Sequence, residues 1–403
     1  MKYLLFLLIL SFGNCFSQTD SALSATDFSS SPPTFFPNTL STHPFGILMS
    51  RINPNFQMKA SRKMAISLNV SNGNVWLPTV KAYLPGDKAD KQRLQEIAWH
   101  KRIWHFDKIN DPSRSIELHA DALIRLYQIR LEIPISPVKE LKINTRFFTL
   151  DPGKFPFSCL TNDEFIEWFH THIAGDDDPF ARMANGCGKT RITYVDQYGK
   201  TMQIGKGYPI FSGIEFSYNQ YPQISYLQKR NMYTCLSFQA GINVSKFNPS
   251  LDFGYSTSIN KQIKLKTNNI LLLGVSAGVL QQKLLMFGPC VEISSSPFIF
   301  SSELIINYQR TLKNNSLLSI GTSFYLQSAY NKKEDYKSIV LTGDYDYSAW
   351  HYSISHLYRN LNSNSLFVSF SKGSYALSVY LREDFLVDNA PDLQTGIGFK
   401  LSF

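Results

Sequence analysis

Apolar and polar residues alternate with a period of two in short runs along the second half of the chain, which is 403 residues long. Turn-forming residues such as Lys372, Gly373 and Ser374 separate the runs. This spacing indicates strands of about 9–11 residues, the length that a tilted strand needs to cross a membrane. The runs with the clearest alternation are 298–309, 318–327, 366–370 and 375–381.

The last run, 393–403, alternates in the same way and ends on Phe403. An aromatic residue at the end of a closing strand is typical of chains that are inserted into a membrane as β-barrels. We therefore expect the barrel-insertion machinery of the envelope to recognise this strand. A water-soluble β-sandwich is the alternative, although its strands are usually shorter and their polar faces carry more charge.

The first 17 residues are predicted to be a secretory signal peptide. Lys2 precedes the apolar run Tyr3–Leu10, and small residues before Gln18 make it the expected first mature residue. Lipidation at Cys15 is an alternative that the residues before it fit poorly. The later stretch 269–280 is the most apolar, but it is too short for a membrane helix. An exported chain without a helical anchor is either soluble in the periplasm, secreted, or a barrel. The strand pattern favours the barrel, and with it the outer membrane of a Gram-negative bacterium.

Composition agrees with a barrel that has membrane lipid as a partner. Aromatic residues make up 14% of the chain, as expected where aromatic girdles flank the apolar band of a barrel. The net charge of +9 is spread along the chain without a basic run. Nucleic acid is therefore not an expected partner, since binding it needs a concentrated basic face.

The predicted fold is an all-β, antiparallel transmembrane β-barrel of about 14 strands, with a range of 12 to 16. We expect residues 18–44 to be a flexible segment, because they are rich in Ser, Thr and Pro. The barrel then occupies 45–403. Two long outer loops are expected at 74–114 and 150–208, with one or two short helices at 88–103 and 163–172.

One predicted strand, 116–130, carries a charged face opposite a clean apolar face. The charged face holds Glu117, His119, Asp121 and Arg125. If the apolar face contacts lipid, these four side chains line the lumen, where they border a solute path. The alternative is an ordinary charged barrel wall without a specific role.

Other candidate sites are weaker. Ser355 and His356 are the residue types of an outer-membrane lipid hydrolase, but neighbours on a strand face opposite sides. His170 and His172 diverge on a helix, so we expect no metal and no cofactor. Cys159 and Cys187 flank one polar segment and are candidates for a disulfide.

Three stretches together resemble an uncharacterised family of predicted outer-membrane barrel proteins, domain of unknown function 3187. They are Arg51–Pro54, Phe165–His170 and the closing region from Glu383 to Phe403. The sequence departs from the family after the helix, where His172–Gly175 matches a Gly-rich run only in part. The resemblance implies a barrel in the outer membrane, and it implies no activity.

The function predicted from these features is a channel or transport-type pore for small solutes of unknown identity. Two alternatives stay open: a lipid hydrolase that uses His356, and a structural or assembly partner in the envelope. An enzyme is the less favoured class, because Ser355 and His356 lack the geometry that catalysis needs.

Overall fold

The computed structural model describes residues 39–41, 45, 48, 54–98, 101–102, 114–153, 158, 160–174, 182, 187–266, 268–313, 315–342, 355–384 and 393–403. They form an all-β, antiparallel closed barrel of 12 strands, with three further strands outside it. The count is lower than the expected 14. The barrel strands are β1 (Ala65–Leu84), β2 (Arg114–Ser136), β3 (Lys139–Asp151), β6 (Ile210–Gln220), β7 (Met232–Asn243), β8 (Ser250–Lys266), β9 (Asn269–Met286), β10 (Phe298–Thr311), β11 (Leu317–Gln327), β13 (Leu361–Lys372), β14 (Tyr375–Asp384) and β15 (Leu393–Ser402).

The barrel closes where β1 pairs with both β15 and β2. Ala65 lies opposite Ser402, and the backbone N–H of Phe403 donates to the carbonyl oxygen of Met64 at 2.9 Å. The predicted closing strand is therefore the last strand of the barrel. Because closure pairs every barrel strand on both sides, none of these 12 strands is left as an edge along the barrel wall.

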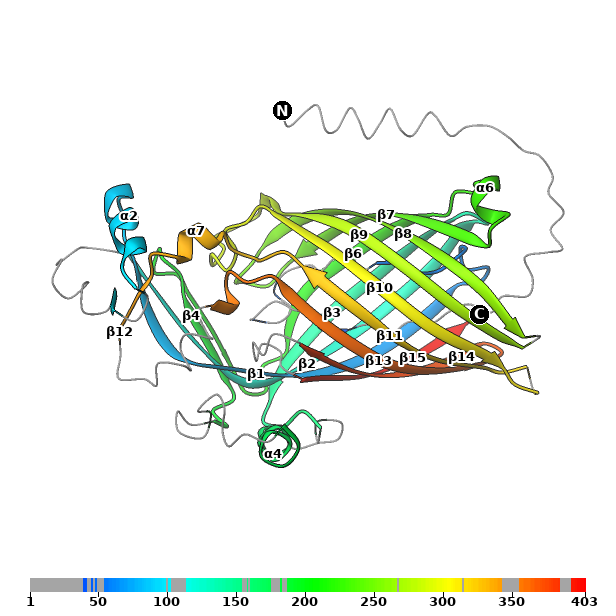
Figure 1. Ribbon diagram of the computed structural model, residues 1–403, viewed down its shortest axis with the longest axis horizontal. Coiled ribbons are helices and arrows are strands. Elements are labelled where there is room, and N and C mark those ends of the chain that lie inside the picture. The colour runs from blue at the N-terminus through cyan, green and yellow to red at the C-terminus, as the bar shows by residue number, and fades with distance from the viewer. Residues whose placement is uncertain are drawn as a thin grey trace. The chain divides into compact units, whose positions relative to one another are not determined.

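The two ends of the barrel differ (Figure 1). At the turn end, β2–β3 and β13–β14 are joined by two residues each. At the loop end, the connections are longer and carry the helices α2 (Lys88–Glu96) and α7 (Lys333–Tyr336), whereas α6 (Ser225–Gln228) lies at the turn end. No helix in the described part of the chain has both the length and the apolar character that a membrane crossing requires.

The alternation predicted from the sequence is confirmed in the C-terminal strands. On β13, Leu366, Val368 and Phe370 point outward and are 58%, 40% and 41% exposed. Ser365 and Ser369, which occupy odd-numbered positions of the same strand, are buried on the lumen side. The barrel wall thus presents an apolar outer surface and a small, polar inner surface, which is the distribution of a membrane barrel.

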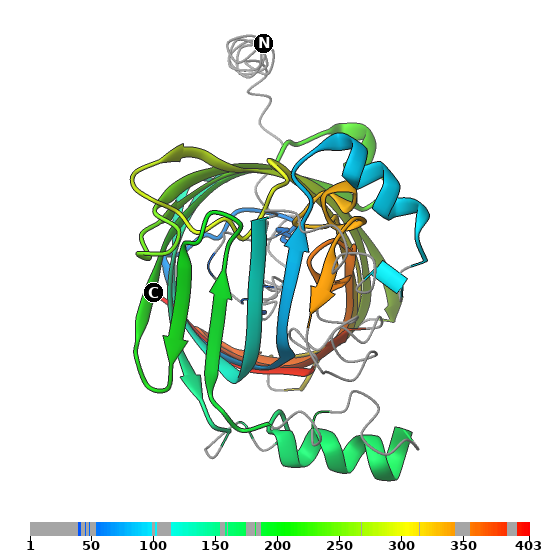
Figure 2. The ribbon, with the colours of Figure 1, turned by 90° about the vertical axis from the view of Figure 1, so that its left-hand side faces the viewer.

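Beyond the loop end, β1 and β2 continue as part of a smaller sheet, here called the extension. Within it β12 (Val340–Thr342) pairs with β1, β4 (Arg191–Val195) pairs with β2, and β5 (Thr201–Gly205) pairs with β4. Figure 2 shows the extension lying in front of the barrel mouth.

The extension changes both loops expected from the sequence. Residues 74–84 belong to β1 rather than to a loop, with a register shift between Leu77 and Val80. The region 150–208 contains the β4–β5 hairpin in addition to its predicted helix, α4 (Asp163–Phe169). Asn162 caps that helix by accepting a hydrogen bond from the backbone N–H of Phe165 at 2.8 Å.

Candidate functional site in the barrel interior

The lumen is occupied by the chain's own N-terminal region. We call the described residues 39–41, 45, 48 and 54–63 the inner segment. Near the loop end, Arg382 of β14 donates to the Thr39 hydroxyl at 2.6 Å, and Asn248 donates to the Leu48 carbonyl at 2.6 Å. Near the turn end, the Ser258 hydroxyl of β8 donates to the Asn55 carbonyl at 2.5 Å. Contacts to two strands and to the β7–β8 connection therefore hold the inner segment along the barrel.

Apolar packing anchors the part of the inner segment that lies under the extension. Leu40, Phe45 and Leu48 are fully buried in one hydrophobic core. The same core contains Val75 and Leu77 of β1. Burying a large apolar side chain stabilises the fold by about 1.5–3 kcal/mol, so these three residues fix the segment firmly. The rest of the predicted flexible region, residues 18–38 and 42–44, lies outside the described part.

Phe56 of the inner segment packs against the inner wall of the barrel. Its side chain is 4% exposed and packs in a cluster with Ile305 of β10, Phe367 of β13 and Tyr380 of β14. A Cβ atom at Gly274 of β9 would lie 2.8 Å from the Phe56 ring, so this strand position has room only for glycine. Side chains from three strands and the glycine of a fourth thus surround one aromatic residue of the inner segment.

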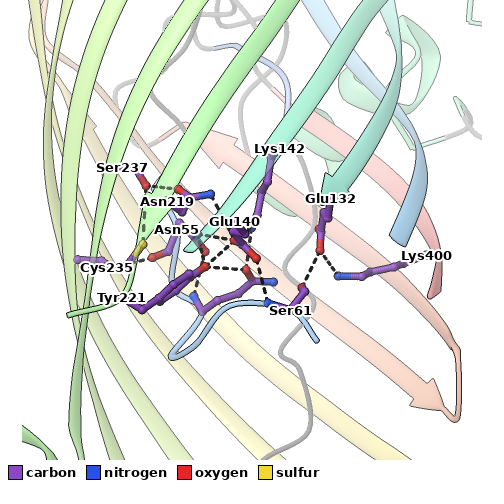
Figure 3. A network of polar contacts seen from close by, with 12 residues as sticks. Asn55, Ser61, Glu132, Glu140, Lys142, Asn219, Tyr221, Cys235, Ser237 and Lys400 are labelled. Carbon is purple, nitrogen blue, oxygen red and sulfur yellow. Dashed lines mark hydrogen bonds and ion pairs between the residues drawn. The ribbon is translucent and has the colours of Figure 1, made fainter. Parts of the chain in front are cut away.

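A polar network holds the segment near the turn end (Figure 3). Its centre is the fully buried carboxylate of Glu140. The inner segment supplies the Asn55 amide at 3.3 Å and the backbone N–H of Ser61 at 3.1 Å. The wall supplies the Lys142 ammonium at 3.0 Å and the Asn219 amide at 3.3 Å. Glu140 therefore accepts from the segment and from the barrel at once.

Tyr221, in the β6–β7 connection, completes this network. Its hydroxyl donates to Glu140 at 2.5 Å and accepts from the Asn55 amide at 2.8 Å. Burial raises the pKa of Tyr221 well above its ordinary value. The hydroxyl therefore keeps its proton and remains a donor to the carboxylate.

A second buried carboxylate, Glu132 of β2, lies beside the first. The Lys400 ammonium of β15 pairs with it at 2.5 Å, and the Ser61 hydroxyl donates to it at 3.3 Å. The side chains of Lys400 and Glu132 are 5% and 3% exposed. A buried charge is tolerated only when it is paired and hydrogen-bonded, and here Ser61 links both carboxylates to the inner segment.

Glu117, His119, Asp121 and Arg125 do not line the lumen as expected. Their strand turns its apolar face inward, because Ile116, Leu118 and Ile124 belong to the core that holds Leu40 and Phe45. The four predicted residues lie on the outer face. There Glu117 forms an ion pair with Lys81 at 3.0 Å, and Arg125 forms one with Asp151 at 3.1 Å. The Asp121 carboxylate accepts a hydrogen bond from the backbone N–H of Lys189 at 2.6 Å. His119 is buried, with 4% of its surface exposed.

Ser355 and His356 lie in a helical turn rather than on a strand. Both are buried, at 0% and 2% exposure, so a lipid substrate has no access to them as they stand. Cys159 lies outside the described residues, and its pairing with Cys187 stays a prediction. Among the described residues, no group of three His, Cys, Asp or Glu side chains is placed to hold a metal ion.

The sequence contained a signal for the interior site that we did not use. In β3, Glu140, Lys142, Asn144 and Arg146 occupy alternate positions, and the residues between them include Leu141 and Ile143. Such a strand has one polar and one apolar face, as a lumen wall requires. The contribution of the inner segment has no comparable signal, because its partners are distant in the chain.

Comparisons with known proteins assign no family to this chain. No family model matches the sequence, so the resemblance to domain of unknown function 3187 gains no support, and no curated protein matches either. Among solved structures, an outer-membrane channel from Pseudomonas putida F1 is 8% identical with a TM-score of 0.39, covering 88% of this chain and 100% of that chain. The β-domain of the Bordetella autotransporter BrkA is 6% identical with a TM-score of 0.34, covering 85% and 100%. The monoaromatic hydrocarbon channel CymD is 9% identical with a TM-score of 0.30, covering 85% and 89%. Likeness at this level assigns the chain to none of the three.

Proposed function

We propose that this protein is an outer-membrane channel for small solutes whose lumen is closed at rest by the inner segment. The observation that carries the proposal is a polar lumen occupied by a stretch of the same chain. In it, Phe56 packs against side chains of three strands, and Asn55 and Ser61 bind Glu140. A wall that is polar inside and apolar outside suits passage of solutes through a membrane.

The apolar outer wall supports the location. Exposed aliphatic and aromatic side chains recur on neighbouring strands, among them Leu304 on β10, Ile320 on β11, Leu366 on β13 and Leu377 on β14. Soluble monomers rarely expose apolar patches larger than a few hundred Å². Lipid chains are the solvent that such a surface fits, so we place the barrel in the outer membrane.

The polar network allows residues 54–63 of the inner segment to leave without destroying the wall, while Leu40, Phe45 and Leu48 stay packed in their core. If Asn55 and Ser61 withdraw from Glu140, the carboxylate keeps Lys142, Asn219 and Tyr221 as partners. Water entering an open lumen replaces the two lost donors. Opening therefore breaks hydrogen bonds but leaves no buried charge without a partner.

Conductance in planar bilayers tests the proposal. We expect the mature chain, residues 18–403, to pass little current and a variant lacking 18–63 to show discrete, salt-dependent steps. Equal conductance from both proteins would contradict closure by the inner segment. Silence from a truncated protein that is shown to be folded would overturn the channel itself.

A tether sharpens this test. Ala60 of the inner segment packs against Cys235 of β7 and Tyr221. The variant Ala60→Cys is expected to form a disulfide with Cys235, which holds the segment in place and suppresses any spontaneous opening until reductant is added. Ala60→Cys with Cys235→Ser is the matched control, and it should respond to reductant no more than the wild type.

We also propose how the chain reaches the outer membrane. The signal peptide at 1–17 directs the chain out of the cytoplasm, and the strand that ends at Phe403 is recognised by the barrel-insertion machinery. In cells, Phe403→Ala is expected to lower the amount of folded protein in the outer-membrane fraction. An unchanged amount would remove Phe403 from this role.

A further inference from the structure

The helix α4 continues as a π-helical turn, η2 (His170–Ala174), and the two together lie outside the barrel wall. Figure 1, in which the barrel runs horizontally, shows α4 end-on near the loop end. Figure 2, viewed from the loop end, shows the same helix from the side, below the barrel. The helix therefore runs across the barrel axis, which is the direction of the membrane plane if the barrel spans a membrane.

A buried arginine fixes the helix to the outer face of β1. Arg182 is fully buried, lies 5.7 Å from the centre of the Trp76 ring, and pairs with Glu167 at 3.1 Å and with Asp163. Asn74 of β1 also donates to Asp163 at 3.0 Å. The acidic side of the helix is thus held against the wall by paired charges.

Apolar side chains remain exposed on this helical region. Trp168 is 48% exposed, Ile173 is 60% exposed, and Leu160, just before the helix, is 45% exposed. The Trp168 ring stacks on the His172 ring at 5.5 Å. Trp is enriched where an apolar environment meets a polar one, because its ring is largely apolar and its N–H group is polar.

Beside the helix, the outward side chains of the barrel wall change from apolar to charged along the barrel axis. Towards the turn end, the outer faces of β1, β2 and β3 expose Leu68, Tyr127 and Phe147. One outward position further towards the loop end on β2 lies Arg125, which bonds Asn72 of β1 at 2.9 Å and Asp151 of β3 at 3.1 Å. The helix lies where an apolar wall gives way to a charged one.

We infer that α4 and η2 form an interfacial helix, which places Trp168 and Ile173 at the boundary between headgroups and acyl chains of the leaflet at the loop end. This inference rests on the proposed membrane location. Amphipathic helices that lie in the membrane plane bury an apolar face at this boundary. The connection that follows β3 then binds the membrane surface directly, and the helix sets how deeply the barrel sits in the bilayer on this side.

Fluorescence quenching by brominated phosphatidylcholine tests the inference on the whole mature chain. The emission lost on Trp168→Phe substitution isolates the signal of Trp168 from that of the other tryptophans. Trp168 is expected to be quenched in vesicles, and more strongly by bromine near the headgroup than by bromine near the chain ends. A reporter in the barrel wall is made by adding Leu366→Trp to the Trp168→Phe variant.

The two reporters separate the possible failures. If the tryptophan at position 366 is quenched and Trp168 is not, the interfacial helix is wrong and the membrane barrel stands. If neither is quenched in folded protein, the proposed membrane location fails and the inference falls with it. Quenching of both, with Trp168 the shallower, supports the inference.

Discussion

Apolar and polar residues alternate in β13 and β14, and they also alternate in the loop-end halves of β1 and β2. The apolar face points outward in the first pair of strands and inward in the second pair. On β13, Leu366 and Val368 face outward and Ser365 faces the lumen. On β2, Ile124 faces inward and Arg125 faces outward. The difference teaches that the medium on each side decides the orientation. The proposed membrane places lipid outside the first pair, while the inner segment and its apolar core lie inside the second.

The largest effect is expected at a buried charge on the lumen side. Lys400→Met leaves Glu132 buried without its ammonium partner, and such a loss costs about 3–5 kcal/mol. The expected result is a matching fall in the free energy of unfolding, measured by denaturant titration in lipid vesicles. Adding Glu132→Gln removes the stranded charge, so the double variant should recover much of the loss. No recovery would show that the two charges do not act as a pair.

Two isoleucines of β2 sharpen the comparison within one strand. Ile124 is fully buried against the core, whereas Ile129 is 43% exposed on the outer face. Ile124→Ala should cost about 2–5 kcal/mol because it leaves a cavity. Ile129→Ala should cost less, since lipid fills the space. Denaturant titration of both variants checks the order, and equal costs would contradict the inward orientation of the apolar face.

A charge on the lipid-facing wall gives the next effect. Leu366→Arg is expected to cost about 2–4 kcal/mol if this position lies near the middle of the bilayer. Gln203→Arg is the matched control, because Gln203 is exposed on β5 of the extension and is expected to change stability by less than about 0.5 kcal/mol. Equal costs in vesicles would place both outer faces in the same medium.

The smallest effect is expected at Glu117, whose ion pair with Lys81 has both side chains more than two-fifths exposed. Glu117→Gln should change stability by about 0–1 kcal/mol. In the variant that lacks residues 18–63, it should leave the ion preference of the current unchanged, because Glu117 lies outside the lumen. Lys142→Met should change that preference. If Glu117→Gln changed the ion preference of the current, Glu117 would line the solute path, as the sequence predicted.

Local patterns predicted much of the wall. The runs around Leu318, Leu366 and Leu377 form strands with the expected face outward, and a helix begins at Asp163 as the sequence predicted. These features depend on neighbours in the sequence, because alternation and capping act over a few residues. The strand number was less certain, since counting rested on weak turn signals and did not separate barrel strands from the extension.

The interior site was not predictable in the same way. Glu132, Glu140 and Lys400 come from three different strands. Asn55 and Ser61 lie in the predicted barrel range 45–403, but the sequence predicted no role for them. Side chains separated by as many as 268 positions meet only after the barrel has closed. No local pattern carries that information.

By itself, the sequence determined which residues of each strand share a face, because a strand turns successive side chains to opposite sides. Only the tertiary structure decided which face is the inside. The Ile116–Leu126 face of β2 was compatible with lipid, yet it covers Leu40, Phe45 and Leu48. Those three residues occupy the space that an open channel would leave to water, and an apolar wall is stable wherever water is excluded, whether by lipid or by the chain itself.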